Sequence, residues 1–307
     1  MTEHDDGTGR RWDGGLLDLD AYLARIGHTG DLSPTPETLR ALHRAHVLAV
    51  PFENLEVLLG RPVLLDLPAL QDKIVRGARG GYCFEHARLF AAALERLGFG
   101  VTGLSSRVGM GSDRVRPATH AVLRVETAET PETGRVWICD VGFGAGPLEP
   151  IGFADGAATA DSGWSFRLER RAAPGAPPGA GEWTLRERRA DGGGWLDLHT
   201  FTANPQYAVD WVVGSHYVST HPRSPFVRRP VVQRTGPDVR QALHGTTWTT
   251  TVRTDGSRRE RKLEPHEVPK VLEDVFGIAL DAEDAAALAA VLERLPADDG
   301  PAEVPAG

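Results

Sequence analysis

The chain has 307 residues, which at roughly 150 residues per domain suggests about two compact units with a sizeable buried core. Hydrophobic residues make up 41% of the chain and charged residues 25%, which argues against collagen-like, coiled-coil and wholly disordered proteins. The 42 acidic residues outnumber the 34 basic ones, the net charge is −8 and no long basic run occurs, so nucleic-acid binding is not expected.

The first part of the chain is predicted to be helical. Residues 1–14 are polar and glycine-rich and are expected to form a flexible tail, which a helical bundle over residues 15–98 follows. Within the bundle, Thr35 is a predicted N-cap with Pro36 at the first helical position, and apolar residues follow at helical spacing.

The strands are predicted in the middle and last parts. Over residues 99–203, short runs rich in Val, Leu, Trp and Phe alternate with Gly and Pro clusters such as 173–181, which is short enough to be a hairpin loop. Residues 204–295 indicate a smaller α/β unit, with a hairpin around 254–257 and two helices near 267–276 and 281–295. Residues 296–307 lack apolar periodicity and are expected to form a second flexible tail.

Cys83 opens a predicted helix. The glycine pair at 80–81 supplies a tight turn before it, and apolar residues keep helical spacing as far as Gly98, which ends the helix. The unpaired N–H groups and the positive end of the helix dipole favour thiolate over thiol, so Cys83 is a candidate nucleophile. An arbitrary cysteine is more often a small buried hydrophobe, but these surroundings favour the nucleophile.

A thiolate nucleophile normally needs a base and a group that orients the base. His120 lies on a predicted strand over residues 119–125, and a second strand over 135–141 follows a loop near residue 130. A hairpin between these strands places His120 opposite residue 141 or, with a slip of one residue, opposite Asp140. Because a carboxylate on an apolar strand is costly unless it is paired, His120 is the predicted partner of Asp140.

Several short segments around these residues follow a family pattern. They are RGGYCFE (79–85), THAVLRV (119–125) and DVGFG (140–144), joined by VPFENL (50–55), STHP (219–222) and SPF (224–226). Together they resemble the arylamine N-acetyltransferases, roughly over residues 16–280. The resemblance implies an α+β fold of helical bundle, β-barrel and α/β lid, with a Cys83–His120–Asp140 triad like that of cysteine proteases. One position departs from the pattern, because Ala87 stands where asparagine is usual. This difference is expected to affect the acceptor pocket or the local helix packing, and not the acyl-transfer chemistry.

The resemblance also implies the chemistry and the binding residues. Cys83 would take the acetyl group of acetyl-CoA, and a small arylamine or hydrazine would then attack the acetyl-cysteine, with no permanently bound cofactor and no metal. The implied CoA contacts are Thr119, Gly142 and Gly144, and the implied walls of the acceptor pocket are Phe143 and Phe201. Thr119 and the two phenylalanines are equally compatible with plain core or turn structure.

Three other functions stay open. An amide synthase related to the family would use the same triad to take a polyketide chain from an acyl carrier protein and close an ansamycin-type macrolactam. The small Ala87 and the insertion between Arg170 and Trp183 favour this alternative. A non-catalytic binding module would keep the cleft without the chemistry, and a cysteine protease would need an open groove for peptides.

The remaining features indicate structure. The glycine-rich run 142–146 is not a dinucleotide-binding loop, because Pro147 and Pro150 preclude the long helix that such a loop opens. The basic cluster at 258–262 is expected to be a solvated face, with phosphate steering as the alternative. Cys139 is expected to be inert packing on a buried strand, and His86 with Cys83 gives too few ligands for zinc.

Two expectations concern the protein's surroundings. No run of about 18 apolar residues occurs, and the acidic start lacks the apolar stretch of a secretory signal, so the protein is predicted to be cytoplasmic and free of membranes. The 2 cysteines are too few for a disulfide-stapled scaffold.

Overall fold

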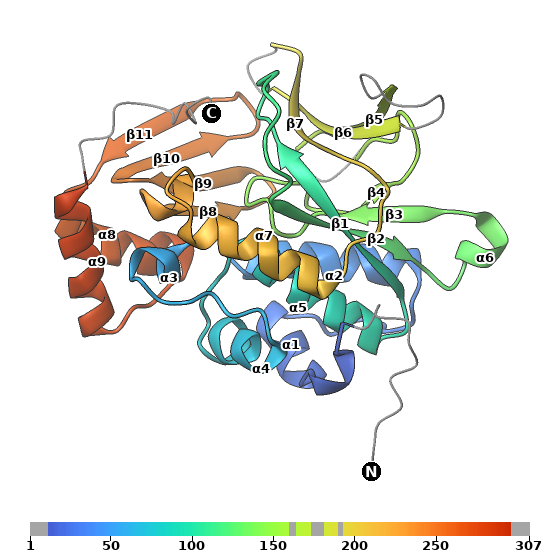
Figure 1. The fold of residues 1–307 in the computed structure, drawn as a ribbon, viewed down its shortest axis with the longest axis horizontal. Helices are drawn as coiled ribbons and strands as arrows, with labels where there is room; N and C mark the ends of the chain where they lie inside the picture. The colour runs from blue at the N-terminus through green and yellow to red at the C-terminus, as the bar shows by residue number, and fades with distance from the viewer. Residues whose placement is uncertain (1–11, 160–163, 173–180, 190–192, 296–307) are drawn as a thin grey trace.

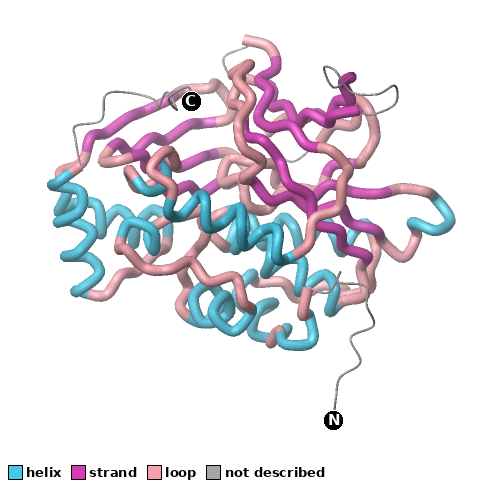
Figure 2. The backbone as a smooth tube through the Cα atoms, viewed as in Figure 1, coloured by secondary structure: helices cyan, strands magenta, loops and turns pink. Residues whose placement is uncertain are grey.

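The computed structural model describes residues 12–159, 164–172, 181–189 and 193–295, and these form three parts (Figure 1). N-terminal helices lie on one side of the molecule, an antiparallel barrel lies against them, and a second sheet with its own helices completes the structure. Figure 2 shows most helices gathered on one side and the strands on the other. The predicted three-part α+β fold is confirmed.

The N-terminal part is built around one central helix, α5 (Cys83–Arg96), whose residues 83–94 are all buried. Before it, α2 (Pro36–Ala49) begins as predicted, since Oγ1 of Thr35 accepts a hydrogen bond of 3.2 Å from the N–H of Thr38. The other helical segments of this part are η1 (Gly14–Leu16), α1 (Leu19–Ile26), α3 (Leu55–Leu58), α4 (Leu67–Leu70) and the π-helical turn η2 (Gln71–Arg76).

Seven antiparallel strands form the barrel. In chain order they are β1 (Gly100–Val108), β2 (His120–Glu126), β3 (Val136–Cys139), β4 (Ile151–Gly152), β5 (Phe166–Ala172), β6 (Gly181–Arg188) and β7 (Trp195–Phe201). Their spatial order is β4-β3-β2-β1-β7-β6-β5. The segment after β4 nearly closes the barrel, because the carbonyl of Ala157 accepts from the N–H of Leu168 on β5 at 2.8 Å. A short helix, α6 (Thr130–Thr133), joins β2 to β3.

Within the described residues, the last part joins two long helices, a second sheet and four shorter helical segments. Its elements are α7 (Ala208–Thr220), η3 (Pro225–Val227), β8 (Val231–Thr235), β9 (Val239–His244), β10 (Thr247–Val252), β11 (Arg258–Lys262), η4 (Pro265–Glu267), α8 (Val268–Val271), η5 (Leu272–Phe276) and α9 (Ala282–Arg294). The sheet order is β11-β10-β9-β8, so the predicted hairpin at 254–257 joins β10 to β11. The two predicted helices correspond to α8 with η5 and to α9.

Phe52 links the C-terminal sheet to the loop before Cys83. The N–H of Phe52 donates to the carbonyl of Gln233 on β8, and the N–H of Gln233 donates back, both at 2.9 Å. Phe52 also forms a parallel bridge with Gly81. The C-terminal sheet is therefore hydrogen-bonded, through Phe52, to the turn that precedes Cys83.

Part of the predicted N-terminal tail belongs to the folded core. Residues 1–11 and 296–307 lie outside the described residues, but Trp12 is only 3% exposed and packs at a tilt against Trp211 with ring centroids 4.7 Å apart. The N–H groups of Trp12 and Gly14 donate to the two carboxylate oxygens of Glu95 at 2.8 Å each. The expectation that residues 12–14 belong to a flexible tail is wrong, because Trp12 enters the core.

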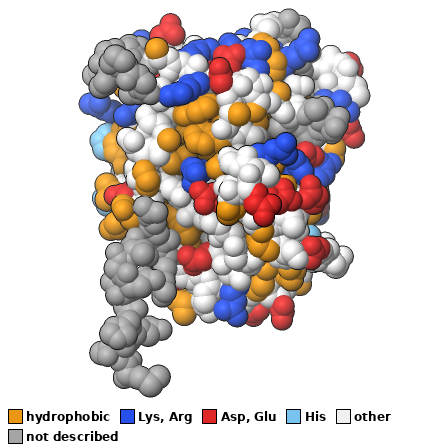
Figure 3. Space-filling view, turned by 90° about the vertical axis from the view of Figure 1, so that its right-hand side faces the viewer, with side chains coloured by type: hydrophobic (Ala, Val, Ile, Leu, Met, Phe, Trp, Pro, Cys, Tyr) orange, Lys and Arg blue, Asp and Glu red, His pale blue; other side chains and the backbone are white. Residues whose placement is uncertain are grey.

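Among the described residues that Figure 3 shows, basic and acidic side chains lie beside one another with small apolar patches between them. On the edge strand β11, Arg258 pairs with Glu260 and Arg261 with Glu267, which fits a solvated face for the predicted basic cluster. Within the described ranges, no helix combines the length and the apolar character needed to cross a bilayer.

Candidate active site

Cys83 occupies the first turn of α5 and is 4% exposed. The carboxylate of Glu85 folds back and accepts a hydrogen bond of 2.9 Å from the N–H of Tyr82, which caps the helix. A Cβ on Gly80 would lie 2.0 Å from the carbonyl oxygen of Pro51, and one on Gly81 would lie 2.8 Å from the Glu85 carboxylate. The glycine pair is therefore needed because backbone and cap fill the space that a side chain would take.

His120 and Asp140 meet, but not as direct cross-strand partners. The ladder between β2 and β3 ends at the pair Leu123–Cys139, so it does not extend to His120 or Asp140. Its register is offset by one residue from the prediction, and the predicted pairing of His120 with residue 141 or 140 is wrong because β3 ends at Cys139. The side chains of His120 and Asp140 meet just beyond the end of the ladder.

The side chains of the three predicted catalytic residues come together. Nε2 of His120 lies 3.0 Å from each carboxylate oxygen of Asp140, and both residues are buried. Cys83 lies close enough to His120 to help raise the pKa of its imidazole, and Sγ of Cys83 is 3.7 Å from the carbonyl oxygen of Thr119. Because Nε2 faces Asp140, Nδ1 is the nitrogen left for the thiol.

The charges in this group support one another. Burial opposes a charge on His120, but the carboxylate of Asp140 and the hydrogen bonds to Asp140 and Cys83 outweigh it and raise the pKa of His120 to about 10. Burial acts against the charged form of Asp140 as well, yet the neighbouring imidazoles hold the pKa of its carboxyl well below the usual range. An imidazolium beside a carboxylate is the partner that a thiolate requires.

A second imidazole contacts the same carboxylate. Nε2 of His199, on β7, lies 2.9 Å from Oδ2 of Asp140, and the rings of His199 and His120 are 5.1 Å apart. His199 is not among the residues predicted for the site from the sequence. The signal that could have indicated it is its position two residues before Phe201, on the same face of a strand. The ligand atoms of His120, Asp140 and His199 lie within 4.8 Å of one another, a spacing that a metal site also has, but Nε2 of each imidazole is engaged by the Asp140 carboxylate.

Comparison with known proteins agrees with this geometry. A family model described as N-acetyltransferase matches residues 35–285. An arylamine N-acetyltransferase of Mycobacterium tuberculosis is 34% identical over 295 residues, which cover 94% of this chain and 99% of that protein. The chain belongs to the arylamine N-acetyltransferase family.

Solved structures of the family share the fold. The arylamine N-acetyltransferase of Nocardia farcinica superposes with a TM-score of 0.87 at 52% identity, over 94% of this chain and 100% of that chain. The enzyme of Mycobacterium marinum in complex with CoA gives a TM-score of 0.81 at 34% identity, over 91% of this chain and 99% of that one. The family and its fold, predicted from the motifs, are thus confirmed.

The two phenylalanines of the predicted acceptor pocket lie beside the imidazoles. The ring of Phe143 is 5.3 Å from that of His120 and 5.4 Å from that of His199. Phe201 is 2% exposed, and its ring is 5.9 Å from His199. Both phenylalanines therefore border the catalytic group, while their role toward an acceptor stays a prediction.

The two glycines predicted to contact CoA pack against the protein itself. A Cβ on Gly142 would lie 2.7 Å from Cα of Cys83 and 2.9 Å from its carbonyl oxygen. Gly144 has φ +83°, and a Cβ there would lie 2.0 Å from the side chain of Gln233. A side chain at Gly142 would clash with Cys83, and one at Gly144 would clash with Gln233. This steric reason for glycine differs from the predicted one, which was contact with CoA.

A buried ion cluster lies behind the helix start. Nζ of Lys73 is 2.7 Å from Oε1 of Glu85 and 3.8 Å from Oε1 of Glu53, which Arg79 contacts at 2.9 Å. Burial disfavours a charged lysine, but the two carboxylates outweigh it and raise the pKa of Lys73. The cluster keeps the Glu85 cap in place and balances its charge.

His86 belongs to a chain of hydrogen-bonded side chains and does not act as the base for Cys83. Its Nε2 lies 3.0 Å from the carbonyl oxygen of Gly81, so Nε2 carries the proton and Nδ1 accepts from Nε2 of His46 at 3.0 Å. Nδ1 of His46 in turn accepts from the hydroxyl of Tyr22 at 2.9 Å. Burial lowers the pKa of His86 to about 4, which keeps it neutral.

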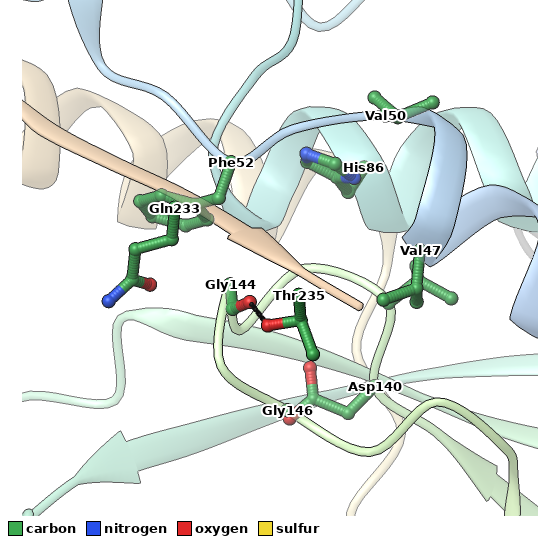
Figure 4. A pocket seen from close by; sticks show the side chains of 10 residues that line it. Val47, Val50, Phe52, His86, Asp140, Gly144, Gly146, Gln233 and Thr235 are labelled. Carbon is green, nitrogen blue, oxygen red and sulfur yellow. Dashed lines mark hydrogen bonds between the residues drawn. The ribbon is translucent and has the colours of Figure 1, made fainter. Parts of the chain in front are cut away.

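His86 and Asp140 line the same small cavity from α5 and from the loop after β3 (Figure 4). Its volume is about 10 Å³, room for about one water molecule. Phe52, Gln233 and Thr235 complete the lining on the side of the C-terminal sheet, and Oγ1 of Thr235 donates to the carbonyl of Gly144 at 2.6 Å. The cavity therefore lies where the three parts of the fold meet.

Three further positions bear on the expectations. Cys139 is 1% exposed and burial raises the pKa of its thiol, which agrees with inert packing. Ala87 is also 1% exposed, within the core. The insertion between Arg170 and Trp183 has its middle, residues 173–180, outside the described residues, and its flanks pair as the predicted hairpin.

Proposed function

We propose that the protein transfers the acetyl group of acetyl-CoA to an arylamine or hydrazine by double displacement at Cys83. The observation that carries the proposal is the buried contact chain from Cys83 through His120 to Asp140 at a helix start. Family membership supports the acyl-transfer chemistry, and the CoA complex of the Mycobacterium marinum relative supports the donor.

In the first half-reaction, the thiolate of Cys83 attacks the thioester carbonyl of acetyl-CoA. The bond between the acetyl carbon and the CoA sulfur breaks, and the imidazolium of His120 protonates the departing thiolate. The products are an acetyl-cysteine, free CoA and a neutral His120. Backbone N–H groups of the first turn of α5, that of Cys83 included, are the proposed donors to the developing oxyanion.

In the second half-reaction, the amine attacks the acetyl-cysteine while neutral His120 accepts the amine proton. The carbon–sulfur bond to Cys83 breaks, the amide leaves, and the thiolate and imidazolium are restored. Asp140 holds the same nitrogen of His120 throughout. We propose that Phe143 and Phe201 border the acceptor, that Thr119 lies beside the thioester, and that Gly142 and Gly144 shape the approach of CoA.

Single-turnover acetylation tests this function. Wild-type protein mixed with acetyl-CoA and digested should carry one acetyl group on the peptide that contains Cys83, and aniline or hydrazine should remove it as the acetyl amide. Cys83→Ala should carry none, while the matched control Cys139→Ala should behave as wild type. A Cys83 that iodoacetamide alkylates rapidly but acetyl-CoA leaves unmodified would overturn the proposal in favour of the macrolactam synthase and its carrier-bound donor.

A further inference from the structure

Three strands of the barrel bring polar residues to one face beside the triad. In the β1–β2 ladder Ser106 lies opposite His120, and in the β1–β7 ladder it lies opposite Phe201. His199 is two residues from Phe201 and so projects to the same face of β7. Ser106 therefore stands between the base His120 and the second imidazole His199.

The hydrogen bonds of this group admit one consistent arrangement of protons. Nε2 of His199 lies 2.9 Å from Oδ2 of Asp140, and an ionised carboxylate can only accept, so Nε2 carries a proton. Burial lowers the pKa of His199, against the opposing effect of Asp140, which leaves the ring neutral and its Nδ1 an acceptor. The Ser106 hydroxyl, 2.7 Å from Nδ1, must then donate to that nitrogen and not to the carbonyl oxygen of Thr200 at 3.0 Å.

We propose that His199 is a positioning residue for the triad: its Nε2–H holds the Asp140 carboxylate, and the Ser106 hydroxyl stabilises that tautomer by donating to Nδ1. This inference rests on the proposed function of Cys83, His120 and Asp140 and extends it. Without the second donor, Asp140 keeps only the contacts to His120, and its carboxylate is free to turn about its side-chain bonds. The imidazole that it orients then loses its fixed direction toward Cys83.

The other titratable groups near Asp140 do not obscure the effect of His199 on the pH profile of Cys83. The titratable groups around it are His120 from β2, His199 from β7, His43 from α2, His86 from α5 across the small cavity, and the adjacent Cys139. Burial lowers the pKa of His43 and of His86 to about 4 and raises that of Cys139, so none of these three is charged near neutral pH. Among the described residues, a change in the pH profile on substitution of His199 therefore reports the Cys83–His120 pair.

Two amide substitutions separate the donor from the volume of the ring. The side-chain nitrogen of His199→Gln extends to the place of Nε2 and can still donate to Asp140, whereas His199→Asn reaches only the place of Nδ1. We expect His199→Asn to lower the rate of Cys83 acetylation at least tenfold, and to move the pH profile of iodoacetamide alkylation at Cys83. His199→Gln should recover most of that rate and profile.

Ser106→Ala provides an independent variant that keeps both imidazoles. It should lower the single-turnover acetylation rate several-fold, because it removes the hydroxyl that donates to Nδ1 of His199 while the pocket walls stay in place. Circular dichroism and thermal melts establish that each variant is folded. Equal acetylation rates and alkylation profiles in wild type, His199→Asn and His199→Gln would overturn the proposal, as would equal impairment of both variants. Alkylation needs no acyl donor, so a failure of the proposed function itself is recognised separately, by wild-type protein that alkylates but does not acetylate.

Discussion

Gly142 tests whether the catalytic geometry depends on the close approach of two backbones. In Gly142→Ala the new Cβ would lie 2.7 Å from Cα of Cys83, 2.9 Å from its carbonyl oxygen and 3.2 Å from Cβ of His86. None of these atoms is the free end of a flexible side chain, so relief requires the loop after β3 or the start of α5 to move. Ordinary contact begins near 3.4 Å, which makes the required displacement somewhat under 1 Å.

The expected result follows from that displacement. Overpacking of this kind destabilises a protein by about 1–3 kcal/mol, and a misplacement of about 1 Å at a catalytic group reduces the rate on the order of 100-fold. The assay is single-turnover acetylation of Cys83 by acetyl-CoA, with urea denaturation for stability. Gly15→Ala is the matched control, because a Cβ at Gly15 meets nothing within 4 Å. Acetylation of Gly142→Ala within threefold of wild type, at unchanged stability, would refute the argument.

The remaining predictions concern buried titratable groups. Burial lowers the pKa values of His43 and His86 to about 4, below the value of about 6.5 in the unfolded chain. As the pH falls, the unfolded chain therefore binds protons at these histidines before the folded protein does. Each histidine should reduce the free energy of unfolding by about 2 kcal/mol between about pH 7 and pH 5. Urea titrations at both pH values measure this, and the same acid sensitivity in His86→Gln contradicts it. Lys73→Met should lower the free energy of unfolding by about 3 kcal/mol, because it leaves the Glu85 carboxylate buried without its cation. The double variant Lys73→Met/Glu85→Gln should recover at least half of that loss in the same urea titration. If the double variant recovers none of it, the pairing of Lys73 with Glu85 is excluded. Cys139→Ala should acetylate within about threefold of wild type, since its thiol is buried and protonated; a larger loss in the single-turnover assay contradicts inert packing.

Local patterns in the sequence were sufficient for the elements that carry the triad. The Gly80–Gly81 pair followed by Cys83 and Glu85 predicts a capped helix start, and the structure has it there. Apolar periodicity predicts the strand of His120 and the paired strand before Asp140. These features depend on residues a few positions apart, whose propensities and hydrogen bonds act within a single turn or strand.

The contacts between those elements depended on tertiary structure. The hairpin register differed from the prediction by one residue, and a slip of one residue changes which side chains meet. The positions of His199 and Ser106 beside Asp140 depend on the pairing of β7 with β1. The burial of Trp12 depends on Trp211, which lies far along the chain, so the local sequence around Trp12 does not indicate it.

Motifs and periodicity were therefore enough for the family and the three-part fold, and they predicted Cys83, His120 and Asp140 as nucleophile, base and acid. The folded arrangement was needed to show how Asp140 is held, why Gly142 and Gly144 are glycine, and which histidines are neutral. The physical reason is that burial and distances between distant segments set pKa values, steric limits and second hydrogen bonds, and neither quantity exists until the chain has folded.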